Sequence, residues 1–366
     1  MDRLKHLYSE NGQSPWLDNL KRSYLTNGTL RDLITGGIRG LTSNPTIFQK
    51  AIQGSTDYDE QQTELVASGT SVIDQYWAMV LADINGALDE FAPLYSESDG
   101  ADGFVSVEVA PGLAHDTAGT EDAARTLHLE IARPNLMVKI PGTAEGVPAI
   151  RQMIAEGRNI NVTLIFSLDR HQRVMDAYLD GLEEYATVNN DLSHVASVAS
   201  FFISRVDTEV DARLTAIGTT EALGLIGTAA IAQARLAYKA FLETFSGPRW
   251  DALAAAGAAV QRPLWASTST KNPAFPDTLY VDELIGPDTV NTLPDATIAA
   301  FEDHGTLART IDHGVAAAEH TWRQLAKVGI DMDDVAEKLE RDGVANFQKS
   351  FDELLAALSA KADQLR

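Results

Sequence analysis

The chain has 366 residues, 45% of them hydrophobic, which is enough for a large core, and its formal charge is 29 − 52 = −23. An acidic surface repels nucleic acid and anionic membranes, and neither a run of about 18 apolar residues nor an N-terminal signal segment occurs, so we expect a cytoplasmic protein with neither partner. The absence of cysteine excludes disulfides and thiolate catalysis, and the eight scattered histidines give no support for a metal site.

Eight short apolar segments are expected to form β-strands, and longer helical patterns alternate with them. The strand segments are residues 15–20, 37–42, 103–110, 135–140, 159–166, 194–203, 262–268 and 289–294. The helical patterns between them are residues 70–91, 121–132, 144–156, 169–187 and 227–245. This alternation predicts an α/β fold, a closed (β/α)8 TIM-type barrel. An open doubly wound sheet is the alternative, but no Gly-x-Gly-x-x-Gly sequence follows the first strand.

Beyond residue 304 the chain is expected to be helical to its end. Apolar side chains recur there at three- and four-residue spacing: Val344, Phe347, Phe351, Leu354, Leu355 and Leu358. No stretch has the composition of an interdomain linker, so we expect one domain, residues 1–366, with residues 304–366 as a helical extension packed on the barrel. This extension either covers a pocket or forms an interface, and the sequence does not decide between them.

One lysine lies inside an apolar strand, in the sequence NLMVKI at residues 135–140. A buried, unpaired ammonium is costly, so Lys139 either reaches solvent at the strand end, forms an ion pair, or serves as a nucleophile. Desolvation favours the neutral amine, which is the form that attacks a carbonyl to make a Schiff base. Lys139 is therefore the first candidate catalytic residue.

Other predicted strands carry polar residues near their carboxyl ends, where the active sites of barrels lie. The carboxylates are Glu108 and Asp18, and the hydroxyl and amide groups are those of Asn161, Thr163 and Ser200. Each residue alone is weak evidence for a site, since hydrogen-bonded polar groups are common at strand ends. Asn44 follows the second strand in Thr-Ser-Asn-Pro, a sequence that also suits a plain turn. Together with Lys139 these residues predict one site, in which the carboxylates balance charge and move protons.

Two basic residues follow the later strands, where many barrels bind phosphate. Arg205 follows the sixth strand and is expected to hold a phosphate, unless it pairs with Asp207 or Glu209 on a helix surface. Lys271 follows the seventh strand and is either a second phosphate ligand or an exposed loop residue.

Three segments resemble the transaldolases, a family of class I aldolase barrels. They are GLTSNPTIF around Asn44, LMVKIPGTAEGVPAIRQM around Lys139, and NINVTLIFS around Asn161 and Thr163. The resemblance continues through WLDNL, VSVEVAP and ASFFISRVD and through residues 262–294, and the long loop after the seventh strand is similar to the actinobacterial and plant-type branch. The compact Ser-aromatic-Arg phosphate motif of the family is replaced by residues 267–271, STSTK, so Lys271 is preferred over Ser269 as second phosphate ligand.

The resemblance implies a transferase of the pentose phosphate pathway that works without a cofactor or metal. Lys139 would form a Schiff base with a ketose phosphate, sedoheptulose 7-phosphate or fructose 6-phosphate. The dihydroxyacetone unit would then pass to an aldose phosphate, glyceraldehyde 3-phosphate or erythrose 4-phosphate. The family's pattern implies a role for each matching residue. Glu108 and Asp18 would transfer protons, and Thr163 would orient Glu108 and a water. Asn44 and Asn161 would bind substrate hydroxyls, and Ser200 and Ser267 would line the pocket. Arg205 and Lys271 would bind the phosphate.

Two other functions remain open at this point. A fructose-6-phosphate aldolase-type lyase would release dihydroxyacetone to water, and sequence motifs separate it poorly from a transferase. A barrel that binds sugar phosphates without turnover is the second, although a binding protein needs no buried lysine beside carboxylates. The oligomeric state, monomer or homodimer, is not readable from the sequence.

Overall fold

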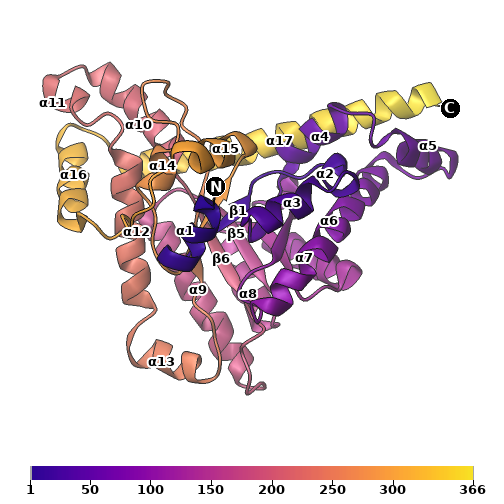
Figure 1. Cartoon of the computed structure of the whole chain (residues 1–366), viewed down its shortest axis with the longest axis horizontal. Helices are drawn as coiled ribbons and strands as arrows, with labels where there is room; N and C mark the ends of the chain where they lie inside the picture. The colour runs from indigo at the N-terminus through magenta and orange to yellow at the C-terminus, as the bar shows by residue number, and fades with distance from the viewer. Residues whose placement is uncertain (1, 366) are drawn as a thin grey trace.

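The structure is a computed structural model that describes residues 2–365, so the two ends of the predicted domain, residues 1 and 366, lie outside the described residues. Eight parallel strands close into a barrel in sequence order (Figure 1). The predicted (β/α)8 barrel is confirmed, and the open-sheet alternative is wrong. The strands are β1 (Gln13–Leu17), β2 (Gly40–Thr42), β3 (Phe104–Glu108), β4 (Leu136–Pro141), β5 (Ile160–Ile165), β6 (Ser197–Phe202), β7 (Arg262–Ala266) and β8 (Thr289–Leu293).

The strands are buried on both faces, one toward the barrel interior and one toward the helices. Both faces therefore need apolar residues, and this is why the strands form near-continuous apolar runs in the sequence. One irregularity occurs in β5, where the pairing with β6 shifts register between Val162 and Ile165. Leu164 lies there with a φ of 59°, and such bulges change the direction in which neighbouring side chains point.

Helices cover the outside of the barrel and fill the connections between strands. Those before β4 are α1 (Arg3–Asn11), α2 (Arg22–Thr26), α3 (Thr29–Gly36), α4 (Pro45–Gln53), α5 (Asp59–Ala67), α6 (Val72–Glu97), the 3₁₀ turn η1 (Pro111–Leu113) and α7 (Thr117–Ile131). Those before β8 are α8 (Gly146–Ala155), α9 (Leu168–Ala186), α10 (Ser204–Ile217), α11 (Thr220–Leu223), α12 (Ala229–Thr244), α13 (Gly247–Ala255) and α14 (Leu279–Asp282). All five helices predicted between strands are present as α6, α7, α8, α9 and α12. Helix α10 and the short helices were not predicted.

The chain after β8 forms α15 (Asp295–His304), α16 (Val315–Lys327) and α17 (Met332–Leu365). The expectation of continuous helix beyond residue 304 is therefore wrong for residues 305–314 and 328–331, where glycines such as Gly329, with a φ of 95°, interrupt the pattern. Helix α16 packs on α12, whereas α17 packs on α4, α5 and α6. Figure 1 shows α17 in yellow, running past α4 toward α5.

A buried ionic network lies beneath β3, at the amino-terminal end of the barrel. Asp102, which is fully buried, accepts hydrogen bonds through Oδ2 from Ser14 Oγ at 2.8 Å and from Arg39 Nε at 2.6 Å. Its Oδ1 accepts from Arg262 Nη1 at 3.1 Å. One carboxylate thus joins three separate segments and fixes the end of the barrel opposite to the predicted site.

Among residues 2–365, no helix combines the length and apolar character that crossing a membrane requires.

Candidate active site

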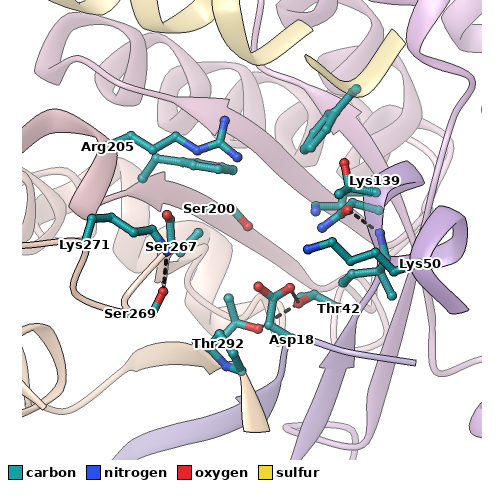
Figure 2. Close-up of a pocket in the computed structure, with 17 residues that line it drawn as sticks. Asp18, Thr42, Lys50, Lys139, Ser200, Arg205, Ser267, Ser269, Lys271 and Thr292 are labelled. Carbon is teal, nitrogen blue, oxygen red and sulfur yellow. Dashed lines mark hydrogen bonds between the residues drawn. The ribbon is translucent and has the colours of Figure 1, made fainter. Parts of the chain in front are cut away.

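A cavity of about 290 Å³ opens at the carboxyl ends of the strands, where barrel active sites lie. Nine of its lining residues come from strands or directly follow them: Asp18, Thr42, Lys139, Ser200, Phe202, Ala266, Ser267, Thr292 and Pro294. The remainder come from helices and loops: Asn44, Thr46, Ile47, Lys50, Arg205, Ser269, Lys271 and Phe347. Figure 2 shows Arg205 and Lys271 on one side of the cavity, Lys139 and Lys50 on the other, and Asp18 between them.

Lys139 and Glu108 form a buried pair on adjacent strands, since they are opposite each other in the register of β3 and β4. The two residues are only 4% and 6% exposed, and Lys139 Nζ lies 3.5 Å from Glu108 Oε2. Nζ also donates a hydrogen bond to the carbonyl oxygen of Ser43 at 3.3 Å. Lys139 therefore does not reach outward to solvent, and its amine lines the cavity beside a carboxylate.

Burial is the main influence on Glu108. It raises the pKa of this carboxyl group from 4.5 to about 7, and the opposing charge of Lys139 offsets only part of the effect. A carboxyl group that titrates near neutrality can both accept and donate a proton under ordinary conditions. It is therefore suited to exchange protons with the amine beside it.

Asp18 directly follows β1, which is two strands away from β3, the strand that carries Glu108, and it lines the cavity. Its Oδ1 accepts a hydrogen bond from Thr42 Oγ1 at 3.0 Å, and Thr42 Oγ1 is 2.7 Å from Thr292 Oγ1. Burial raises the pKa of Asp18, while the charge of Lys139 and the Thr42 hydrogen bond act against this rise. The two carboxylates thus approach the lysine from different strands, which allows them different roles.

Asn161 and Thr163 of β5 are fully buried and are not among the residues that line the cavity. Asn161 Nδ2 donates to Ser106 Oγ at 3.0 Å, and its Oδ1 accepts from Ser200 Oγ at 2.8 Å. Thr163 Oγ1 and Glu108 Oε2 are both buried and have no hydrogen-bond partner within residues 2–365. Through Ser200, which lines the cavity, the amide of Asn161 is connected to the site.

Asn44 combines the two interpretations that the sequence left open. It lies two residues after β2 and caps α4, with Oδ1 accepting from Ile47 N at 3.0 Å and Pro45 at the first helical position. It also lines the cavity. Because its oxygen is occupied by the cap, its amide nitrogen is the group available to a ligand.

The predicted phosphate ligands lie together at one end of the cavity. The helix-surface alternative for Arg205 is wrong, because Asp207 is bonded to Tyr280 and Glu209 pairs with Arg213. The guanidinium of Arg205 instead lies 5.0 Å from the ring centre of Phe202, within the cavity wall.

Lys271 is exposed but also lines the cavity, and its Nζ donates to Ser269 Oγ at 2.6 Å. Ser267 completes this end, with a φ of 56° and its Oγ 3.0 Å from Ser204 Oγ. Burial lowers the pKa of Arg205, and burial together with the charge of Arg205 lowers that of Lys271. Two cations that repel each other at one end of a cavity favour an anion there.

Several cavity residues were not identified from the sequence, and Lys50, Thr292 and Phe347 are the most informative. Lys50 lies six residues after Asn44 and two residues beyond the end of the GLTSNPTIF segment, so its position gave only a weak signal. Phe347 was noted only as part of an apolar helical repeat, and its place in α17 shows that this helix covers part of the cavity. No group of His, Asp and Glu side chains suited to a metal ion occurs in the described part of the chain.

The fold and this geometry define a class, a (β/α)8 barrel with a buried lysine–carboxylate pair at its catalytic end, as in enzymes that form lysine Schiff bases. The family model described as Transaldolase/Fructose-6-phosphate aldolase matches residues 15–358. A transaldolase of Parafrankia sp. (strain EAN1pec) is 52% identical over 346 residues, 94% of each chain. A transaldolase of Acidothermus cellulolyticus is 51% identical over 357 residues, 97% of this chain and 96% of the relative. The transaldolase of Mycolicibacterium smegmatis is 51% identical over 354 residues, which are 96% of this chain and 95% of the relative.

The chain therefore belongs to the transaldolase/fructose-6-phosphate aldolase family, and these relatives place it among the transaldolases, which are transferases. The resemblance stated from the sequence motifs is confirmed, and so is the similarity to actinobacterial members.

Proposed function

We propose that the chain transfers a dihydroxyacetone unit from a ketose phosphate to an aldose phosphate through a Schiff base on Lys139. The donors are sedoheptulose 7-phosphate and fructose 6-phosphate, and the acceptors are glyceraldehyde 3-phosphate and erythrose 4-phosphate, in the non-oxidative pentose phosphate pathway. The observation that carries this proposal is the buried Lys139–Glu108 pair, whose lysine lines a cavity that Arg205 and Lys271 also line.

The first step needs a neutral amine. Glu108 accepts a proton from the ammonium of Lys139 across the 3.5 Å that separates them, and the freed amine adds to the ketose carbonyl. Addition leaves a positive charge on nitrogen and an alkoxide on carbon. Glu108 gives its proton to the alkoxide and takes a second proton from the nitrogen, which yields the neutral carbinolamine. It then gives this second proton to the hydroxyl group, which leaves as water while the nitrogen lone pair forms the iminium. Two protons of the original ammonium thus leave in the water, and Glu108 ends as a carboxylate. Thr163 Oγ1, which bonds to no protein group among the described residues, orients the departing water and, through this water, Glu108.

The second step breaks the bond between C3 and C4. Asp18 takes the proton of the C4 hydroxyl, a carbonyl forms at C4, and the electrons of the broken bond pass into the iminium to give an enamine. The aldose phosphate leaves, an acceptor aldose enters, and the same steps run in reverse. Asn44 and Asn161 bind hydroxyls of the dihydroxyacetone unit, and Ser200 holds Asn161 in orientation through their 2.8 Å hydrogen bond.

The phosphate binds at the far end of the cavity. Arg205 provides a planar fork of donors, and Lys271 provides a point charge. Ser267 and Ser269 line the same end, and their hydroxyl groups are within reach of a bound anion. The scheme uses only groups of the chain itself and calls on no cofactor.

Two related functions lead to different measurements. An aldolase-type lyase protonates the enamine and releases dihydroxyacetone, and the description of the family model includes both activities. Incubation with fructose 6-phosphate, with and without erythrose 4-phosphate, separates transfer from release. A non-catalytic sugar-phosphate-binding barrel predicts binding without turnover, and the lysine–carboxylate pair argues against it.

The deciding experiment is borohydride trapping with fructose 6-phosphate, followed by mass mapping of the peptides. We expect a reduced dihydroxyacetone adduct on Lys139 and none in the Lys139→Met variant. The absence of an adduct on any lysine of folded protein would overturn the Schiff-base scheme. The oligomeric state, monomer or homodimer, and the cytoplasmic location both stay predictions. The phosphorylated substrates support a location inside the cell, because charged sugars do not cross a bilayer unaided.

A further inference from the structure

Two threonines lie beside Asp18, and the proposed function gives them no role. Thr42 ends β2 and Thr292 belongs to β8, and these are the two strands that flank β1 in the closed barrel. Both line the cavity, although they are only 2% and 3% exposed. Thr42 Oγ1 lies 3.0 Å from Asp18 Oδ1 and 2.7 Å from Thr292 Oγ1. Figure 2 shows the three side chains together at the wall of the cavity.

The number of available protons sets the direction of these hydrogen bonds. A threonine hydroxyl has one proton to donate, and an ionised carboxylate can only accept. When Asp18 is ionised, Thr42 therefore donates to Asp18 Oδ1, and the proton of Thr292 makes the 2.7 Å contact with Thr42. Thr292 Oγ1 has no other hydrogen-bond partner within residues 2–365, so no other protein group there competes for this proton. The hydrogen bonds form one chain, from Thr292 through Thr42 to Asp18.

The backbone around Thr292 is held from two sides. The Asp18 N–H donates to the carbonyl oxygen of Leu293 at 2.9 Å, which ties the end of β8 to the end of β1. Thr268 Oγ1, from the segment after β7, donates to the carbonyl oxygen of Thr292 at 3.1 Å. The hydroxyl of Thr292 is thus presented to Thr42 from a fixed position.

This chain of hydrogen bonds leaves one oxygen of Asp18 for the substrate. Oδ1 is occupied by Thr42, whereas Oδ2 has no hydrogen-bond partner in the described part of the chain. A hydroxyl that itself accepts a hydrogen bond is a stronger donor, so Thr292 strengthens the bond from Thr42 to Oδ1. Without Thr292, the hydroxyl of Thr42 is a weaker donor and can turn to the carbonyl oxygen of Leu17, 3.5 Å away.

We propose that Thr292 is a positioning residue for carbon–carbon cleavage, which acts through Thr42 to hold Asp18 with Oδ1 bound and Oδ2 facing the C4 hydroxyl of the substrate. This inference rests on the proposed function, because it takes Asp18 as the base for that step. Thr292 itself neither gives nor takes a proton in the reaction. Its loss therefore slows cleavage and leaves Schiff-base formation at Lys139 unchanged.

The test follows the trapped intermediates in Thr292→Val, since valine keeps the shape of threonine and removes its hydroxyl group. Enzyme in excess is mixed with fructose 6-phosphate, and a coupled dehydrogenase removes the glyceraldehyde 3-phosphate that is released. Borohydride is added at successive times, and mass spectrometry measures how fast the six-carbon adduct on Lys139 is replaced by the three-carbon adduct. Thr289→Val is the matched control, because Thr289 is a buried threonine of the same strand that bonds to Gln13, at the other end of the barrel. Thermal unfolding verifies that both variants fold.

We expect conversion to the three-carbon adduct to slow about five- to tenfold in Thr292→Val, as for the loss of one hydrogen bond, with KM within about twofold of the wild type. The six-carbon adduct should form at the normal rate. Thr292→Ser, which keeps the hydroxyl, should resemble the wild type, and so should Thr289→Val. A normal conversion rate in Thr292→Val would overturn the proposal. A raised KM with normal conversion would make Thr292 a substrate contact and would overturn it as well.

A second comparison tests whether Thr292 acts through Thr42. Thr42→Val removes the hydroxyl that bonds to Asp18, so it should slow conversion at least as much as Thr292→Val does. In the double variant the effect of Thr292→Val should disappear, because the group through which Thr292 acts is already missing. Losses that add in the double variant would show that Thr292 acts independently, which contradicts the proposal.

The pKa of Asp18 gives a measurement that does not depend on turnover. Burial raises this pKa, and the groups that act against the rise are the charge of Lys139, the hydrogen bond from Thr42, and the charges of Arg205 and Lys271. The charge of Glu108 also faces Asp18. Of these influences, Thr292→Val weakens only the hydrogen bond from Thr42. A hydrogen bond to the charged form lowers a pKa, so the pKa of Asp18 should rise in this variant and not in Thr289→Val.

Nuclear magnetic resonance of isotope-labelled aspartate carboxyl carbons measures this pKa, and the signal of Asp18 is identified by its loss in Asp18→Asn. If trapping fails in the wild type, the Schiff-base scheme fails, but the titration still tests Thr292. An unchanged pKa of Asp18 in Thr292→Val would refute the assignment of Thr292 even where trapping succeeds.

Discussion

Replacement of Glu108 by glutamine should remove a pH-dependent step from the reaction. In the scheme above, Glu108 must be ionised to accept the proton of Lys139, and burial raises the pKa of this carboxyl group to about 7. When Glu108 is protonated, the ammonium of Lys139 has no acceptor and the amine cannot attack. Activity should therefore rise with pH through about 7 and be lost as the pH falls below it.

The expected size follows from the ionised fraction. With a pKa of about 7, roughly a tenth of Glu108 is ionised at pH 6 and roughly nine tenths at pH 8. The kcat/KM should therefore rise about tenfold between these two pH values. Glutamine cannot accept the proton, and loss of one acid–base group costs about 10²- to 10⁴-fold, or about 3–5 kcal/mol of activation free energy. The residual activity of Glu108→Gln should lack the rise near pH 7.

The assay couples the glyceraldehyde 3-phosphate that forms from fructose 6-phosphate and erythrose 4-phosphate to a dehydrogenase. Ionic strength is held constant across pH, because the acidic surface makes anion binding sensitive to salt. A Glu108→Gln variant that retains the rise near pH 7, or that loses less than about tenfold in kcat/KM, would refute the role given to Glu108.

Four further substitutions, one of them a control, test other parts of the structure. Asp18→Asn keeps the hydrogen bond from Thr42 but removes the base for carbon–carbon cleavage, so kcat should fall about 10²-fold or more. Borohydride should still trap the intact ketose on the lysine. Trapping of the three-carbon unit at the normal rate would contradict this role of Asp18. Phe347→Ala opens the wall that α17 provides and should raise the release of free dihydroxyacetone to water, whereas Phe351→Ala, on the same helix but outside the cavity, should not. Both changes should lower the unfolding free energy by about 3–5 kcal/mol in urea titrations, and equal release would show that Phe347 does not exclude water. Asp102→Ala leaves two arginines without their shared carboxylate, so the unfolding free energy should fall by about 3–5 kcal/mol. The kcat at 25 °C should change little. A melting temperature like that of the wild type would refute this prediction.

The strands and the central lysine were predictable because the barrel imposes strong sequence constraints. A strand buried on both faces must be apolar, so eight such runs between helical patterns were visible without any structure. Against that background, Lys139 and Glu108 are conspicuous, since a charged residue in a buried strand needs a partner. The register of β3 and β4 then brings them opposite each other.

Residues that reach the cavity from helices were harder to predict. Lys50 lies on the exposed side of α4, where a lysine is ordinary, and Phe347 follows the apolar repeat expected of any packed helix. Neither residue departs from its local pattern, so only the arrangement of α4 and α17 over the barrel identifies them. The break at residues 305–314 was missed for a related reason, since a few glycines interrupt a segment that is otherwise rich in helix-forming residues.

Phe347 belongs to the last helix, which is synthesised after every strand of the barrel is complete. A nascent chain can therefore assemble the lysine, the carboxylates and the phosphate ligands before the wall formed by α17 is present. Such an intermediate would hold the reactive amine in an open site, and any enamine formed there would meet water. A proteolytic product that lacks α17 should therefore release the dihydroxyacetone unit to water instead of transferring it.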